Sequence, residues 1–246
     1  DLGCVAGTVH DNQGNPLVGI DALVCVVASR SSCLFAVTDE NGFFASGIPE
    51  TMTNVEEVSI SFKSSETRLL TPFCLHHQLC DGTVHFCEPF VVYPAPTSGV
   101  EIPTTALTED LRIEAADGGA VIMPTGEEIW PPLSTTWAAL TRYPIDEHVP
   151  CFIDSENLPI ALYAVTEPDT EFATGSTARF GLDLPNDTGL DAGTVVNVFS
   201  LAGAHASRYG LTEGQWVQET TATVSADGSR IQTAEGDGLQ YLTWFG

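Results

Sequence analysis

Basic residues are scarce in this sequence. Lys63 is its one lysine, and lysine and arginine together number 8 against 33 aspartates and glutamates, so the formal net charge is −25 at pH 7. Such a charge repels phosphate groups, which argues against nucleic-acid binding and against attraction to anionic membrane surfaces. The acidic residues are scattered rather than grouped in blocks. We expect them to form a solubilising surface; a reservoir of cation ligands is the alternative.

Long apolar runs are also missing. No stretch reaches the roughly 18 consecutive apolar residues that a membrane-spanning helix needs, so we expect no membrane insertion. Long helical stripes are missing as well. The run TTWAAL at 135–140 fits a short helix and fits a strand equally well.

The common catalytic motifs are absent. The sequence has no G-x-S-x-G, no H-E-x-x-H, no Walker loop, and no G-x-G-x-x-G after a strand. Asp146, Glu147 and His148 lie together, but neighbours on a strand point to opposite faces, so we expect an exposed polar loop there. His205 is isolated. We therefore predict no catalytic residues and no enzyme activity.

Period-two alternation of apolar and polar residues is the strongest positive signal. VSISFK at 58–63 and TARFGLDL at 177–184 each place their apolar residues on one face. This alternation is typical of half-buried antiparallel strands. With frequent Gly, Pro, Asn and Asp turns, it predicts an all-β protein built of β-sandwich-type domains.

A proline-rich segment divides the chain. The run VVYPAPTSGVEIPTTALTED at 91–110 ends a strand and then combines prolines with small polar residues. Prolines keep such a segment extended and deny it hydrogen-bond donors. We predict a cysteine-rich domain at 1–93, a linker at 94–110 and a second β-rich domain at 111–246.

The first domain carries two paired motifs. Residues 7–19 read G-x-V-x-D-x-x-G-x-P-L-x-G, and residues 38–44 read TDENGFF. At this spacing the pair resembles the carboxypeptidase regulatory-like domain, which implies a small transthyretin-like or prealbumin-like β-sandwich. The resemblance covers about 90 residues and implies a domain that accompanies catalytic domains without catalysing.

The stretch TDENGFF predicts a tight turn. Asp39 would cap it through its own side chain, Asn41 and Gly42 would adopt positive φ, and Phe43 or Phe44 would enter the core. The alternative is a calcium loop. An EF-hand would continue with further acidic ligands, whereas this chain continues with FFASGIP.

The seven cysteines are concentrated in the first domain, which indicates an oxidising compartment and disulfides. Cys25 and Cys33 are symmetric about Ser29, so a hairpin there would place them opposite each other. A second disulfide would join Cys74 to Cys80 or Cys80 to Cys87, and Cys4 could take the remaining partner. Cys151 would then be buried and inert. A zinc site is the alternative for this cluster: Cys74, His76, His77, Cys80, His85 and Cys87.

The second domain resembles a ZU5-like module of extracellular and cell-surface proteins. A strand ending in LP precedes GLDAGTVVNVFSL at 189–201, and Trp216 begins a later strand that turns at ADG. The resemblance implies a folding signature rather than a catalytic one. Asn186 begins an N-x-T sequon, which indicates a surface turn.

Together these features predict a non-catalytic structural or adhesion module. We expect a secreted or cell-surface segment of a larger protein, with a protein or glycan partner and no cofactor; bound calcium is the alternative. The alternatives are a carbohydrate- or ligand-binding module and an accessory domain of a secreted hydrolase. An exposed pair of tryptophans in a groove would favour sugar binding; the four are Trp130, Trp137, Trp216 and Trp244.

Overall fold

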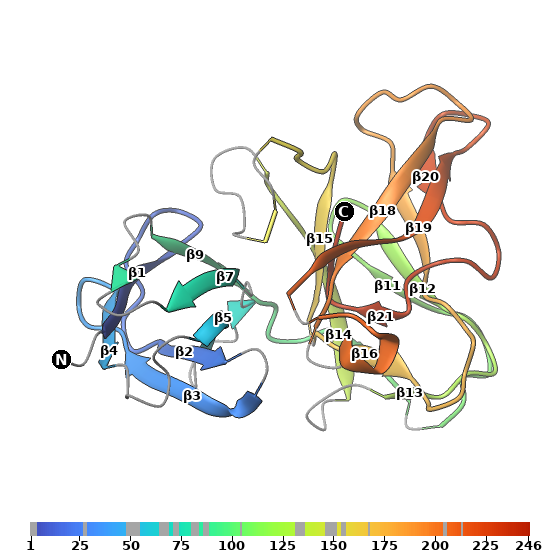
Figure 1. Cartoon of the computed structure of the whole chain (residues 1–246). Coiled ribbons are helices and arrows are strands. Elements are labelled where there is room, and N and C mark those ends of the chain that lie inside the picture. The colour runs from blue at the N-terminus through green and yellow to red at the C-terminus, as the bar shows by residue number, and fades with distance from the viewer. Residues whose placement is uncertain are drawn as a thin grey trace. The chain divides into compact units, whose positions relative to one another are not determined.

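The chain is nearly all β in a computed structural model (Figure 1). The structure describes residues 4–26, 29–47, 55–63, 69–70, 74–79, 84–85, 89–103, 105–130, 136–145, 152–153, 156–166, 168–203, 206–212 and 214–246. Within these ranges the one helical element is a 3-10 turn, η3 (Ala206–Tyr209). None of the helices found there is long and apolar enough to cross a membrane. The prediction of an all-β fold is confirmed.

The chain divides into two compact units. Unit 1 comprises residues 1–95 and 146–157, and unit 2 comprises residues 96–145 and 158–246. Part of the segment predicted as a linker contributes to unit 2. Residues Val100–Glu101 form β10, which pairs with β14, and Ile102 and Leu107 are buried in the unit 2 core.

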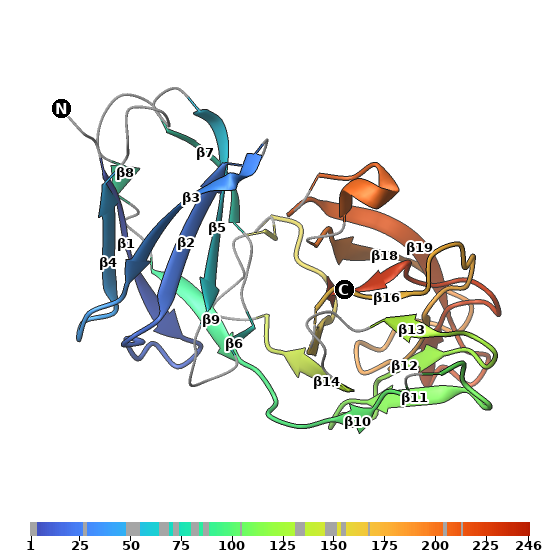
Figure 2. The same cartoon turned by 90° about the horizontal axis from the view of Figure 1, so that it is seen from below.

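Unit 1 is a β-sandwich, and Figure 2 shows β1 and β4 in one layer and β2 and β5 in the other. One sheet contains β1 (Cys4–Asp11), β4 (Phe43–Gly47), β6 (Leu69–Leu70), β8 (Val84–His85) and β9 (Phe90–Pro94). The other contains β2 (Asp21–Val26), β3 (Ser29–Val37), β5 (Val55–Lys63) and β7 (Cys74–Leu79). β1 pairs in parallel with both β8 and β9.

The core of unit 1 contains the residues that alternation places inward, although Ser61, expected on the polar face of β5, is buried as well. Ile60 and Phe62 of β5 are fully buried, as are Ala22 and Val24 of β2. Phe44, Phe62 and Phe90 pack with ring centroids 5.1 to 6.1 Å apart, which joins the two sheets through one aromatic cluster. Aromatic contacts of this kind supply a large share of core stability in a small domain.

The stretch TDENGFF is a turn. The Asp39 carboxylate accepts hydrogen bonds from the backbone N–H groups of Asn41 (2.8 Å) and Phe43 (3.0 Å). Gly42 has φ 71°, and a Cβ there would lie 2.5 Å from the Val9 carbonyl oxygen, so glycine is required twice over. Phe44 is the residue that enters the core. The expected positive φ at Asn41 is wrong, because one glycine already reverses the chain.

The predicted Cys25–Cys33 disulfide is present. Cys25 lies opposite Cys33 in the antiparallel pairing of β2 with β3, with a Cα–Cα distance of 4.0 Å. The partners were predicted correctly, but the hairpin does not turn at Ser29: this residue begins β3 and pairs with Val26 after a register shift. Cys4 begins β1, and Cys80, Cys87 and Cys151 lie outside the described residues.

Unit 2 contains a curled ten-stranded sheet. Its order is β10-β14-β15-β22-β18-β19-β20-β17-β12-β11, and β11 near one end also approaches β14 near the other. The strands are β11 (Leu111–Glu114), β12 (Ala120–Met123), β14 (Trp137–Tyr143), β15 (Leu162–Thr166), β17 (Gly181–Pro185), β18 (Val195–Leu201), β19 (Trp216–Val224), β20 (Arg230–Gln232) and β22 (Trp244–Phe245). The ambiguous run around Trp137 is thus a strand.

A separate three-stranded sheet positions the pocket described below. Its order is β13-β16-β21, with β13 (Ile129–Trp130), β16 (Thr170–Phe172) and β21 (Tyr241–Leu242). The rings of Phe172 and Phe180 stack with their centroids 4.0 Å apart, and this contact fixes β16 against the core. The expected alternation of 177–184 is confirmed, since Phe180, Leu182 and Leu184 are buried.

Replacing Asp39 with alanine tests the turn. We expect Asp39→Ala to lower the free energy of unfolding by about 1 kcal/mol, because two backbone donors lose their charged acceptor at an exposed site. Urea unfolding measures the change. Glu40→Ala, at the neighbouring exposed position, is the matched control and should have little effect; an equal loss in both variants would contradict the capping role.

Candidate functional site

The strands that carry the Cys/His cluster belong to opposite sheets. β7 holds Cys74, His76 and His77 and pairs with β5, whereas β8 holds His85 and pairs with β1. Cys80 and Cys87 fall outside the described residues. Where residues are described, no group of three or more His, Cys, Asp or Glu side chains is arranged to hold a metal ion.

Other residues singled out from the sequence cannot be placed. Asp146, Glu147, His148, Cys151 and His205 all lie outside the described residues. The predictions made for them stay predictions.

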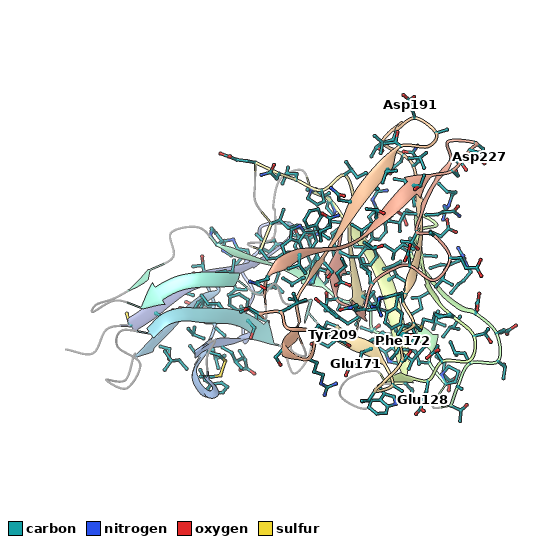
Figure 3. The ribbon with its side chains drawn as sticks, turned by 45° about the vertical axis from the view of Figure 1, so that its right-hand side comes forward. Glu128, Glu171, Phe172, Asp191, Tyr209 and Asp227 are labelled. Carbon is teal, nitrogen blue, oxygen red and sulfur yellow. A yellow bond between two sulfur atoms is a disulfide. The ribbon has the colours of Figure 1, made fainter. Side chains whose placement is uncertain are left out.

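Several carboxylates hold turns rather than lining a site. Asp227 accepts hydrogen bonds from the Ser225 hydroxyl (2.6 Å) and from the Ser229 hydroxyl and backbone N–H (2.8 and 3.0 Å). These bonds lower the pKa of Asp227 to about 2. Asp11 and Asp39 accept backbone N–H groups in the same manner. Figure 3 shows Asp227 and Asp191 at loop tips of unit 2.

Asp183 is held by a cross-strand network. Its carboxylate accepts from Arg230 (2.7 Å), Arg112 (2.8 Å) and Gln232 (3.0 Å). Burial opposes ionisation of Asp183, but these donors outweigh it, so the pKa of Asp183 is lowered. The network ties β11, β17 and β20 together.

The sequon residue Asn186 is also structural. Its amide nitrogen donates to the carbonyl oxygens of Leu190 and Gly228, each at 2.8 Å. Its amide oxygen accepts from the Thr188 hydroxyl (3.0 Å) and the Leu190 N–H (3.2 Å). The expected surface turn is present, and both amide hydrogens are engaged in it.

One pocket of unit 2 gathers groups of a different kind. Glu171 on β16 is 5% exposed, and its carboxylate accepts from Arg208 of η3 and, at 3.1 Å, from the Tyr209 hydroxyl. Figure 3 shows Glu171, Phe172 and Tyr209 close to one another. A buried carboxylate requires such partners, because an unpaired charge in the interior is strongly destabilising. Burial and the Glu171 charge raise the pKa of Tyr209 to about 12.

A second group of hydrogen-bonded polar residues lies beside the pocket. Glu219 on β19 accepts from the Ser200 hydroxyl and, at 2.8 Å, from the backbone N–H of Gln240. Burial raises the pKa of Glu219 despite these bonds. Tyr241 stacks on Tyr209 at 5.2 Å, and burial raises its pKa as well. Gln240, which lines the pocket, is therefore held through its backbone N–H by a partly buried carboxyl group.

Tight packing holds the chain at the entry to β16. Asp169 is the one non-glycine residue with positive φ (66°) where the backbone is described. A Cβ at Gly203 would lie 1.8 Å from its carboxylate oxygen, so a larger residue there would displace the Asp169 side chain. Strained backbone of this kind often accompanies functional sites, which directs attention to this region.

The pocket has a volume of about 220 Å³. Its charged lining residues are Arg179, Arg208 and Glu171, so positive groups outnumber negative ones. A larger groove of about 660 Å³ nearby shares Arg179 but is lined by five acidic residues: Asp110, Glu127, Asp183, Glu235 and Asp237. The two hollows therefore differ in charge on a strongly acidic chain.

The four tryptophans do not form a platform on which a sugar ring could stack. Trp244 is buried, Trp137 and Trp216 are half-buried, and Trp130 is 45% exposed. Trp216 stacks on Phe199 at 6.2 Å. The exposed pair that would favour a sugar-binding groove is therefore not formed.

No protein-family model matches this chain, and a search of curated proteins finds no match. The assignment of function therefore depends on the geometry of the described residues.

The partly buried Glu219 carboxyl predicts a pH-dependent stability. Because its folded pKa is raised, the stability it contributes is full below the unfolded pKa of about 4.3 and is lost as pH rises through the folded pKa. Glu219→Gln mimics the protonated form. We expect the stability of this variant relative to the unaltered chain to increase with pH across that window.

Urea unfolding of both chains across the pH series measures this difference. Glu235→Gln, at an exposed site of the same unit, is the matched control and should show no such trend. A Glu219→Gln difference that stays constant with pH would contradict the assigned burial effect.

Proposed function

We propose that this chain is a non-catalytic structural or adhesion module of an extracellular or cell-surface protein. The observation that carries the proposal is which groups the carboxylates contact. Those of Asp11, Asp39 and Asp227 hold turns, and that of Asp183 bridges strands. Acid and base catalysis requires titratable groups directed at a shared point, and these groups are directed at the backbone or at arginines.

The disulfide supports the extracellular part of the proposal. Cys25–Cys33 closes the hairpin of β2 and β3. Disulfides of this kind persist in oxidising compartments and are rare in reducing ones. The surplus of acidic residues fits a soluble, exposed module with a protein or glycan partner.

We propose the family likenesses on the same terms. The turn geometry of Asp39 and Gly42 and the entry of Phe44 into the core support a carboxypeptidase regulatory-like unit 1. The turns at Gly189 and Gly193, each with positive φ before β18, support a ZU5-like unit 2.

A hydrolase panel tests the absence of catalysis. We expect the chain to turn over chromogenic ester, peptide and glycoside substrates no faster than buffer does, because no nucleophile and base converge in the residues described. Glu171→Gln should give the same null result. Turnover by the unaltered chain that Glu171→Gln abolishes would overturn the proposal and favour the hydrolase alternative.

Protease resistance tests the structural role. The double variant Cys25→Ser/Cys33→Ser should lose about 2–3 kcal/mol of stability, since the short closed loop no longer restrains the unfolded chain. Native-state digestion by a broad protease should then be about 30-fold to 150-fold faster. The difference should vanish when both proteins are digested with reductant; a difference that persists would show that the substitution, not the disulfide, is responsible.

A further inference from the structure

The pocket beside η3 has hydrogen-bond donors to spare. Arg208 uses one guanidinium nitrogen on Glu171, and its side chain is 55% exposed. Arg179 uses one nitrogen on the carbonyl oxygens of Thr177 (3.2 Å) and Ala178 (3.0 Å), and no carboxylate of the described residues contacts it. Each guanidinium carries five N–H donors, so both retain unused ones facing this pocket.

Three other arginines pair with carboxylates. Arg112 meets Asp183 and Glu114, and Arg230 meets Asp183. Arg142 contacts both Asp117 and Asp187. In a chain with so few basic residues, two guanidinium groups at one small pocket are a marked local concentration of positive charge.

The carboxylate and the serine hydroxyl that line the pocket already have hydrogen-bond partners. Both oxygens of Glu171 are engaged, one by Arg208 and one by Tyr209. The Ser176 hydroxyl donates to Glu127 at 2.7 Å. The unused capacity is therefore mainly that of donors, which suits a ligand that brings acceptors.

Size limits that ligand. The pocket volume is about 220 Å³. This accommodates one carboxylate and the atoms next to it. Thr174 and Gly175 at the rim are exposed, so a larger ligand could extend into solvent.

We propose that this pocket binds the carboxylate group of a small organic ligand, held by Arg179 and Arg208 between the 173–176 loop and η3. Guanidinium groups recognise carboxylates through parallel, charge-assisted hydrogen bonds. The ring of Tyr209, stacked on Tyr241, forms an apolar wall for the atoms attached to the carboxylate. This site is independent of the proposed structural role.

Glu171 provides a test of whether the pocket binds a negatively charged ligand. It orients Arg208 but repels a second carboxylate. In Glu171→Gln the amide oxygen can still accept from Arg208 and the amide nitrogen can donate to the Tyr209 hydroxyl. Carboxylate affinity should therefore rise in this variant, whereas a ligand bound through the Glu171 charge would be lost.

NMR titration of the isotope-labelled chain tests the proposal, with acetate, glucuronate and glucose as probes at constant ionic strength. We expect both carboxylates to shift the amide signals of residues 173–176 and 207–210 in a saturable manner, with dissociation constants in about the millimolar range. Glucose, which has the ring without the charge, should not. Tighter binding of glucuronate than acetate would identify an acidic sugar as the better ligand; equal binding would identify a bare carboxylate.

Variants complete the test. Arg179→Gln should weaken carboxylate binding about ten-fold or more, and it leaves Glu171 paired, so the fold is retained. Arg112→Gln removes an arginine outside the pocket and should leave binding unchanged. The proposal is overturned if neither carboxylate shifts these signals saturably, if glucose binds as well, or if Glu171→Gln abolishes binding.

Discussion

The demand of carboxylates for hydrogen-bond donors shapes this protein more than any other constraint. With 33 acidic residues and 8 basic ones, arginine cannot satisfy them all. Exposed acids are satisfied by water and by backbone N–H groups in tight turns, as at Asp39 and Asp227. The few arginines are then placed where acids are partly buried, at Asp183 and Glu171. Arginines therefore pair with the carboxylates that are shielded from water, because loss of hydration destabilises an unpaired carboxylate only in the interior.

Much of the fold could be predicted because its signals are local. Alternation in β5 and around Phe180 follows directly from the two-residue period of a strand. The Asp39 turn needs only residues within five positions of one another. The disulfide joins two cysteines that are eight residues apart and lie opposite each other in one hairpin. Each of these features depends on neighbours in sequence, so a single sequence contains the information.

The pocket could not be predicted because its partners are distant in sequence. Glu171 and Arg208 come together because η3 packs on the three-stranded sheet. Glu219 accepts a hydrogen bond from Gln240, which is 21 residues away in the sequence. In the sequence Glu171 stands between Thr170 and Phe172 on a short strand, where alternation would place it in solvent. Its burial depends on the curl of the sheet and on the strand order of unit 2, and no local pattern encodes either. The same reason explains why β10 was expected in a linker, since its pairing with β14 spans a long stretch of chain.

The hydrogen bonds of Asn186 have a consequence for secretion through a glycosylating compartment. Oligosaccharide transfer would replace one of the two amide hydrogens that tie this turn to Leu190 and Gly228. Sugar attachment and closure of the turn therefore compete for the same nitrogen atom. Once the turn has closed, the sequon is concealed by its own fold, and a glycan could be added only to chains that have yet to fold there.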